Sequence, residues 1–246
     1  MEIFAGRVIN PRSAPAADLS GDGELLPAGS VDAADYLPAL EEIDKPLVVF
    51  LGGFCDASTL RFYDTALEYR DGASLAEPPA FSPERPFPWP EPARHGAAKD
   101  HDVYYRCHDT RAHILRLMER YHLAGRAIAL VGHSWGGASA YKLAQKSGLP
   151  VKLLATLDPV SIFPLGLRNK PRNVRRWINV SLDYNLADLR DSSNLTALIG
   201  RPWGKSARAD SSYDFIATWP GAALPGHAWC YEMFNFYVRP ELEGVR

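Results

Sequence analysis

The short segment LVGHSWGGA, residues 130–138, constrains the fold more than any other part of the chain. Gly132, Ser134 and Gly136 fill the pattern G-x-S-x-G, in which a strand ends at the serine and a helix starts directly after it. Such a turn strains the backbone of the serine and leaves no room for side chains two positions away, so glycine is required at both places. The segment therefore predicts a sharp strand–helix turn that exposes a serine hydroxyl.

The residues on either side of this turn fit that interpretation. Residues 126–131 are an apolar run of strand length, and residues 135–146 have the composition of a helix. Gly148 and Pro150 follow, and both residue types are typical of a helix end. The alternative is an ordinary glycine-rich turn, because the bare pattern is common by chance. The flanking strand and helix favour a serine nucleophile.

Strand-like and helix-like segments alternate along the chain. Strands are expected at 46–51, 102–107, 126–131, 151–157 and 176–182. Helices are expected at 58–69, 110–122, 135–146 and 226–237, with Ser58 and Asp109 as N-caps of the first two. The alternation predicts an α/β fold whose central sheet is mostly parallel and is covered by helices on both faces.

Length and composition fit a single α/β domain over residues 1–246. Residues 1–45 are rich in Ala, Pro, Gly and Asp, which predicts an irregular segment that wraps the surface. Seven prolines between 78 and 92 exclude a helix or a central strand there, so this segment is either a variable loop or a rim of the active-site mouth. Residues 183–225 are expected to form a loop-rich cover over the site.

The composition excludes several classes of protein. A formal net charge of −2 gives no support to nucleic-acid binding. Cys55, Cys107 and Cys230 are too few and too widely spaced for a disulfide framework or a structural zinc site, so neither a metal nor a cofactor is expected. The N-terminus shows no secretory signal peptide and no apolar run could cross a bilayer. We expect a soluble chain, either cytoplasmic or exported by a signal-independent route.

One basic segment stands out. It contains Arg168, Lys170, Arg172, Arg175 and Arg176. The simpler interpretation is a solvated surface segment that leads into a strand. The alternative is a patch that attracts anionic head groups and gives peripheral contact with a membrane.

A serine hydroxyl becomes a useful nucleophile when a base takes its proton and a carboxylate orients the base. In folds built around this turn, the acid and then the histidine follow the serine along the chain. Of the seven histidines only His227 lies well downstream of Ser134, since His133 belongs to the turn itself. A lone histidine is more often structural, but this chain order favours His227 as the base.

The acid must lie between the serine and His227, an interval without glutamate. Its candidates are Asp158, Asp183, Asp188, Asp191, Asp210 and Asp214. Asp158 and Asp183 each follow a predicted strand directly, so both reach the carboxyl edge of the sheet. Pro159 ends the first of these strands and holds the carboxylate of Asp158 at the rim. We therefore prefer Asp158, although it also fits a simple Asx-type turn.

An anion forms on the carbonyl oxygen during acyl transfer and needs N–H donors that are already in place. Trp135, the residue after the nucleophile, is expected to supply one backbone N–H. The second is expected from the loop after the strand 46–51, either from Phe54 or from Gly53. A simple turn at Gly52 and Gly53 is the alternative.

These motifs resemble the α/β-hydrolase superfamily over residues 46–238. The segments LGGF, GHSWGG, TLDPV and WINV, together with His227, are similar to bacterial lipase-like hydrolases. Some of that group are antibacterial effectors of type VI secretion, which implies an inhibitory or immunity protein as a candidate partner. The resemblance implies Ser134, Asp158 and His227 as nucleophile, acid and base, and the acid in Leu-Asp-Pro is also similar to the pancreatic-lipase arrangement.

The sequence as a whole predicts a cofactor-free serine hydrolase that cleaves carboxylic esters, with lipid or phospholipid esters favoured. Aromatic residues could line its acyl pocket or belong to the core: Trp135, Phe163, Trp203, Phe215, Trp219 and Trp229. An amidase or a thioesterase would use the same residues. The alternative from another class is an inactive binding or scaffold protein with this fold. A cysteine nucleophile at Cys55 or Cys230 is disfavoured, because neither lies on such a turn.

Overall fold

The computed structural model describes residues 37–53, 56, 61–71, 100–107, 111–162, 169–184, 191–215 and 226–246. The strands in this part of the chain are β1 (Leu47–Gly52), β2 (Asp102–Cys107), β3 (Ile128–His133), β4 (Val151–Leu157), β5 (Val174–Leu182) and β6 (Ser211–Phe215). The α-helices are α2 (Arg61–Asp71), α3 (Arg111–Leu123), α4 (Trp135–Ser147), α5 (Ser192–Ile199), α6 (Cys230–Tyr237) and α7 (Arg239–Leu242). A short 3-10 helix, η3 (Leu40–Glu42), precedes β1.

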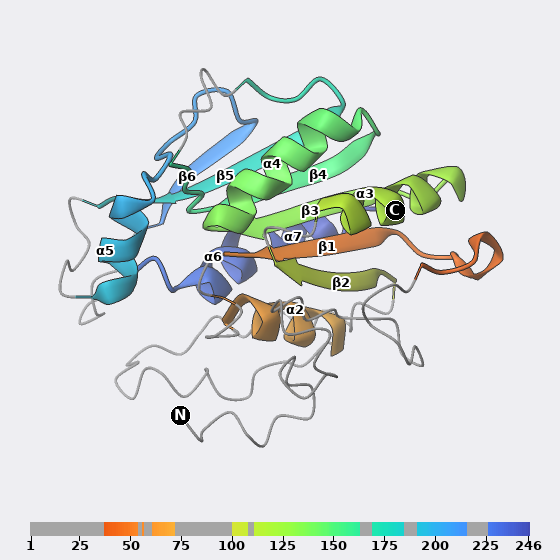
Figure 1. Ribbon diagram of the computed structural model, residues 1–246, viewed down its shortest axis with the longest axis horizontal. Helices are drawn as coiled ribbons and strands as arrows, with labels where there is room; N and C mark the ends of the chain where they lie inside the picture. The colour runs from red at the N-terminus through yellow and green to blue at the C-terminus, as the bar shows by residue number, and fades with distance from the viewer. Residues whose placement is uncertain are drawn as a thin grey trace.

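The six strands form one parallel sheet in the order β2-β1-β3-β4-β5-β6 (Figure 1). From β1 the chain moves outward to β2, whereas from β3 it moves in the opposite direction to β4, β5 and β6. The loops that follow β1 and β3 therefore diverge and leave a crevice outside the carboxyl ends of these two strands. The fold thus prepares a site at the end of β3.

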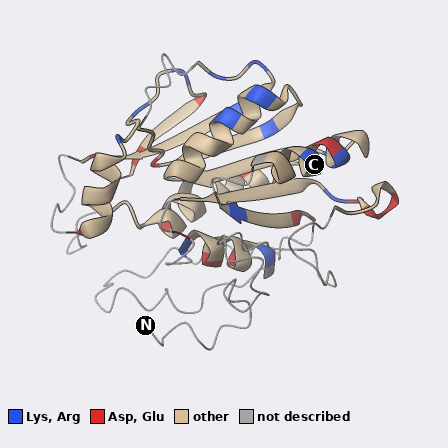
Figure 2. Ribbon diagram, in the orientation of Figure 1, with Lys and Arg blue, Asp and Glu red and all other residues tan. Residues whose placement is uncertain are grey.

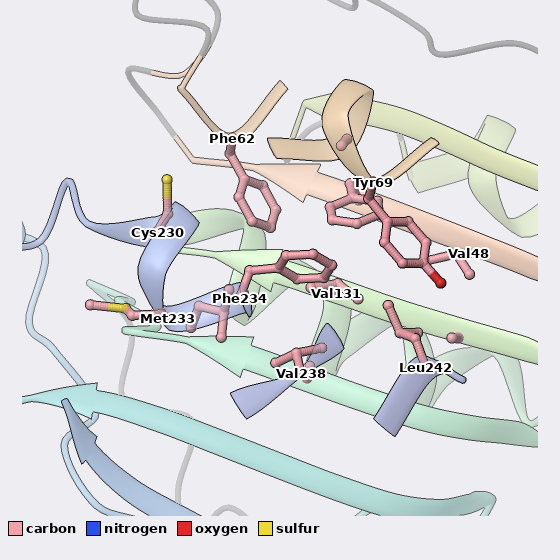
Figure 3. Packing of buried hydrophobic residues seen from close by; sticks show 14 of the residues in the cluster. Val48, Phe62, Tyr69, Val131, Cys230, Met233, Phe234, Val238 and Leu242 are labelled. Atoms are coloured by element: carbon pink, nitrogen blue, oxygen red, sulfur yellow. The ribbon is translucent and has the colours of Figure 1, made fainter. Parts of the chain in front are cut away.

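Helices cover both faces of the sheet, which confirms the predicted α/β fold. Residues of α3 and α4 pack with one set of alternating strand residues, among them Val49 and Leu130. Residues of α2, α6 and α7 pack with the other set, which includes Val48 and Val131 (Figure 3). Strands that are buried on both faces read as continuous apolar runs, which is why β1, β3 and β4 are easy to find in the sequence.

The described residues of the segment 183–225, namely 183–184 and 191–215, contain more regular structure than the predicted loop-rich cover. Residues 211–215 extend the sheet as its sixth strand instead of covering the site, and residues 192–199 form α5. Strand β6 lies at the edge of the sheet and its sequence SSYDF is only partly buried, so it lacks the apolar run typical of a buried strand. The expected N-caps Ser58 and Asp109 lie outside the described residues.

None of the helices in the described part of the chain is long and apolar enough to cross a membrane.

Candidate active site

Ser134 lies on the turn between β3 and α4 with φ 58° and ψ −128°. This left-handed conformation is unusual for a residue other than glycine and is the strain expected of a nucleophile elbow. A Cβ atom on Gly136 would lie 2.0 Å from the carbonyl oxygen of Leu51, and one on Gly132 would lie 2.3 Å from the carbonyl oxygen of Gly136. Both glycines are therefore needed for the close approach of α4 to β1 and β3.

His227, in the loop before α6, forms a hydrogen bond with the serine. Its Nε2 lies 2.8 Å from the Oγ of Ser134, although the two residues are 93 positions apart in the sequence. The backbone of His227 is held from two sides. Its N–H donates to Oδ1 of Asn194 in α5 at 2.6 Å, and its carbonyl oxygen accepts from Nε2 of His133 at 2.8 Å.

Asp158 follows β4 directly, with φ 38° and no exposed surface. Its Oδ2 lies 2.6 Å from Nδ1 of His227, and its Oδ1 accepts from the backbone N–H of Leu182 at 3.1 Å. A carboxylate can only accept at this contact, so Nδ1 of His227 carries the proton and Nε2 presents a lone pair to the serine hydroxyl. Asp183, the other candidate acid, is half-buried at the end of β5.

The structure thus brings Ser134, His227 and Asp158 into one line of hydrogen bonds at the carboxyl ends of β3 and β4. Backbone hydrogen bonds tie the same two loops together. The N–H of Ser134 donates to the carbonyl oxygen of Leu157, and the N–H of Val160 donates to the carbonyl oxygen of Ser134. The geometry of Ser134 and that of Asp158 are therefore coupled.

His133 and Asn194 hold the backbone of His227, but no sequence pattern identifies either of them for this role. His133 is buried, and this burial together with the neighbouring charge of His227 lowers its pKa to about 3. It is therefore neutral at physiological pH and donates through Nε2, because a carbonyl oxygen only accepts. Asn194 is buried on a short helix that the sequence pattern does not predict.

The residues expected to supply N–H groups to an oxyanion are partly described. Trp135 is the first residue of α4, so its N–H lies at the positive end of the helix dipole. Gly53 lies against the serine, since a Cβ atom there would be 2.7 Å from Cβ and 3.1 Å from Oγ of Ser134. Only glycine leaves room for a substrate carbonyl between the two. Phe54 lies outside the described residues.

Asp56 anchors the loop that carries Gly53. Its backbone N–H donates to the carbonyl oxygen of Gly53 at 3.1 Å. Its carboxylate accepts from the backbone N–H of Phe62 at 2.8 Å and from the hydroxyl of Tyr105. Burial raises the pKa of Asp56 to about 6, against an ordinary value of 3.8, even though these hydrogen bonds act in the opposite direction.

This buried carboxyl group predicts a pH-dependent cost to stability. The folded protein binds the Asp56 proton more tightly than the unfolded chain does, so the contribution of Asp56 to stability is fully present below pH 3.8 and is lost as the pH rises through 6. The loss is on the order of 3 kcal/mol. Asp56→Asn should not show this loss. Between pH 4.5 and 7.5, the free energy of unfolding of the variant should therefore rise relative to that of wild type.

Urea unfolding of both proteins across this pH range measures the difference. Glu119→Gln, which removes an exposed carboxyl group from α3, is the control and should show a smaller shift. A constant difference between Asp56→Asn and wild type at every pH would contradict the prediction.

A cavity of about 420 Å³ opens beside the serine. Its aliphatic lining comes from Val160 and Ile162 after β4 and from Ala197 and Ile199 of α5. Polar and charged residues also line it, among them Asp56 and Arg61. A volume of this size suits a small molecule or one part of a larger one.

The expected aromatic pocket is mostly aliphatic. Trp135 lines the cavity, but Trp203 and Phe215 pack in the two hydrophobic cores, and Trp229 packs on Phe215. Phe163 and Trp219 lie outside the described residues. The alternative, that the aromatic residues belong to the core, therefore fits three of the four described rings.

Cys230 is buried in α6 and also lines the cavity. Burial and the nearby carboxylates of Asp56 and Glu232 raise the pKa of its thiol well above the usual value. A thiol nucleophile acts as the thiolate, so this environment disfavours Cys230 as a nucleophile. Cys55 lies outside the described residues. No group of three or more His, Cys, Asp or Glu residues in the described part of the chain could hold a metal ion.

The basic segment lies far from this site. Its described residues stand before and at the start of β5, whereas the site is at the carboxyl end, so the length of a nine-residue strand, roughly 25 Å, separates them. Figure 2 shows basic residues where α4 ends and β5 begins, away from α5. Lys170 pairs with Asp210 at 2.7 Å, and Arg176 pairs with Glu241 at 2.6 Å. These contacts favour the simpler interpretation of a solvated surface segment.

No protein-family model matches the chain, and no curated protein matches it significantly. Similar solved structures include a protein of unknown function from Agrobacterium tumefaciens, named as a candidate alpha/beta hydrolase (12% identity, TM-score 0.45, covering 81% of this chain and 87% of that one). A protein from Thermus thermophilus is similar at 14% identity and TM-score 0.41, covering 85% and 91% of the two chains. The thioesterase domain from the curacin biosynthetic pathway is similar at 11% identity and TM-score 0.38, covering 85% and 92%. Likenesses this distant carry no argument about what this chain does.

Proposed function

We propose that this protein is a serine hydrolase that cleaves carboxylic esters through an acyl-enzyme. The observation that carries the proposal is the unbroken set of hydrogen bonds from Ser134 through His227 to Asp158 at a strained strand–helix turn. The order of these residues along the chain and the turn after β3 support an α/β-hydrolase. A binding protein would have no need to keep the nucleophile in this conformation.

In the proposed reaction, Oγ of Ser134 attacks the ester carbonyl carbon while Nε2 of His227 takes the hydroxyl proton. The carboxylate of Asp158 stabilises the resulting imidazolium. The N–H of Trp135, with a second N–H from the loop at Gly53, stabilises the oxyanion. Collapse of the tetrahedral intermediate breaks the bond to the alcohol, which leaves with the proton from His227. Water then attacks the acyl-enzyme by the same route and releases the acid.

We propose a lipid ester or phospholipid ester as the substrate class. The aliphatic residues that line the cavity beside the serine suit an acyl chain, and its polar and charged residues suit a hydrophilic alcohol or head group. Three apolar side chains are exposed at or next to this lining: Ile162, Leu195 and Ile199. They support contact of the cavity mouth with an apolar surface. The resemblance of the sequence motifs to lipase-like hydrolases supports the same choice.

The acyl chain length should depend on Thr196, which lines the cavity from an exposed position on α5. Thr196→Phe places a ring in the space assigned to the acyl chain without disturbing the core. We expect kcat/KM for p-nitrophenyl octanoate to fall at least about 10-fold, because a bulky group in the pocket excludes the longer chain. The value for p-nitrophenyl acetate should stay within about twofold of wild type, since a two-carbon chain does not reach the ring.

Steady-state hydrolysis of p-nitrophenyl esters of graded length, and of phospholipid vesicles, tests both the function and the pocket. Leu195→Phe is the matched control, because residue 195 is exposed on the same helix but does not line the cavity. Equal losses on both esters in Thr196→Phe would place the acyl chain elsewhere. No turnover of any ester or phospholipid by folded wild-type protein would overturn the proposed function in favour of a binding role.

A further inference from the structure

Besides His227, a second side chain forms a hydrogen bond with Asp158. Tyr184 lies two residues after the end of β5, and its hydroxyl donates to Oδ2 of Asp158 at 2.5 Å. This is the same carboxylate oxygen that accepts from Nδ1 of His227. The tyrosine oxygen also lies 3.3 Å from that Nδ1. The hydroxyl, the carboxylate and the imidazole therefore meet at one point.

This hydroxyl remains a donor at every pH at which the protein works. Burial, reinforced by the adjacent carboxylate of Asp158, raises the pKa of Tyr184 far above its usual value. Tyr184 also packs against the hydrophobic core between the sheet and helices α2 and α6, which holds its ring in place. Its hydroxyl hydrogen is therefore held toward Oδ2 rather than being shared with solvent.

The contact has two physical consequences for Asp158. A fully buried carboxylate is costly to ionise, and each hydrogen bond to its charged form reduces that cost. The N–H of Leu182 holds Oδ1 in place, and the hydroxyl of Tyr184 helps to hold Oδ2. These two donors therefore fix the plane of the carboxylate independently of its contact with His227. The same donor also withdraws part of the negative charge that would otherwise stabilise a protonated His227.

We propose that Tyr184 is a positioning residue that orients Asp158 and restrains the basicity of His227. The inference rests on the proposed function insofar as it concerns turnover, but the effect on His227 does not depend on any substrate. Tyr184 touches no reacting atom. It acts through the carboxylate oxygen that it shares with the imidazole.

Other titratable and charged groups line the same cavity as His227. They are His133 of β3, Asp191 at the start of α5, Cys230 of α6, Asp56, and Arg61 of α2. His133 stays neutral through the relevant range, because its pKa is about 3, whereas Asp56 titrates near pH 6. All these groups are unchanged by Tyr184→Phe. The difference between the variant and wild type therefore isolates the hydroxyl.

The test is the titration of His227 in wild type and in Tyr184→Phe, followed by NMR of the imidazole nitrogens. His227→Gln identifies the resonance. We expect the pKa of His227 to rise by about 0.5 to 1 unit in Tyr184→Phe, because Asp158 regains the charge that the hydroxyl withdrew. Tyr237→Phe is the matched control, since it removes a hydroxyl from another tyrosine that packs on the same core. It should leave the pKa of His227 unchanged.

Kinetics on a soluble ester give the second measurement. In Tyr184→Phe we expect kcat to fall by about 10-fold with little change in KM, and the acid limb of the pH profile to move upward with the His227 pKa. When Tyr184→Phe is added to Asp158→Asn, the pKa of His227 should not change further. If the pKa of His227 rises in Tyr184→Phe but the wild-type protein has no esterase activity, this inference stands and the proposed function is contradicted. An unchanged His227 pKa in Tyr184→Phe, or an equal shift in the Asp158→Asn background, would overturn the inference.

Discussion

Replacement of Ser134 by alanine is expected to lower kcat for ester hydrolysis by about a millionfold, to the residual rate that binding and the oxyanion donors alone provide. No other hydroxyl in the described part of the chain forms a hydrogen bond with Nε2 of His227, so no neighbour there can take over the attack. The substitution removes one oxygen from a left-handed turn and keeps the Cβ atom. The fold should therefore survive, and circular dichroism and thermal unfolding can verify this.

Ser139→Ala is the matched control for that prediction. Ser139 is buried on α4, as Ser134 is buried at the turn before it, but it does not line the cavity. It should therefore keep wild-type kcat. Turnover of folded Ser134→Ala at the wild-type rate would show that another residue is the nucleophile.

Asp158→Asn should lower kcat by about 10,000-fold with the fold preserved. An asparagine at this position can turn its amide N–H toward Nδ1 of His227, which places the imidazole proton on Nε2 and leaves no lone pair for the serine hydroxyl. The buried setting of Asp158, with its contacts to Leu182 and Tyr184, leaves little room for the side chain to escape. Steady-state kinetics on a soluble ester, at a pH on the plateau of the profile, measure the loss.

Asp183→Asn is the comparison that decides between the two candidate acids. Asp183 is half-exposed and follows the next strand of the sheet, so its replacement should change kcat by less than about 10-fold. The reverse ranking, with Asp183→Asn the more damaging of two folded variants, would assign the acid role to Asp183.

Local patterns predict the parts of this fold that depend on local physics. The G-x-S-x-G turn follows from backbone sterics around Ser134, and β4 begins and ends at the predicted residues because it is a continuous buried apolar run. Strand β6 escapes prediction because an edge strand needs few apolar residues, and its pairing with β5 is set by the sheet rather than by its own sequence.

The same distinction applies to the candidate site. Chain order and strand ends lead to Ser134, His227 and Asp158, because each of them stands at a recognisable turn or strand end. Asn194 and Tyr184 carry no such signal, since their contacts span 33 and 26 positions and exist only once α5 and β5 have packed at the carboxyl edge. The basic segment has a clear pattern in the sequence, but the topology places it at the other end of β5.

The central claim is that Ser134 is an activated nucleophile, and covalent labelling tests it most directly. Wild-type protein is treated with a fluorophosphonate, and the adduct is located by mass spectrometry of its peptides. Because the Ser134 hydroxyl forms the hydrogen bond with Nε2 of His227, we predict one phosphonylated residue, Ser134. We also predict no adduct in Ser134→Ala and a strongly reduced labelling rate in Asp158→Asn. An adduct on another residue, or folded wild-type protein that stays unlabelled, would contradict the account.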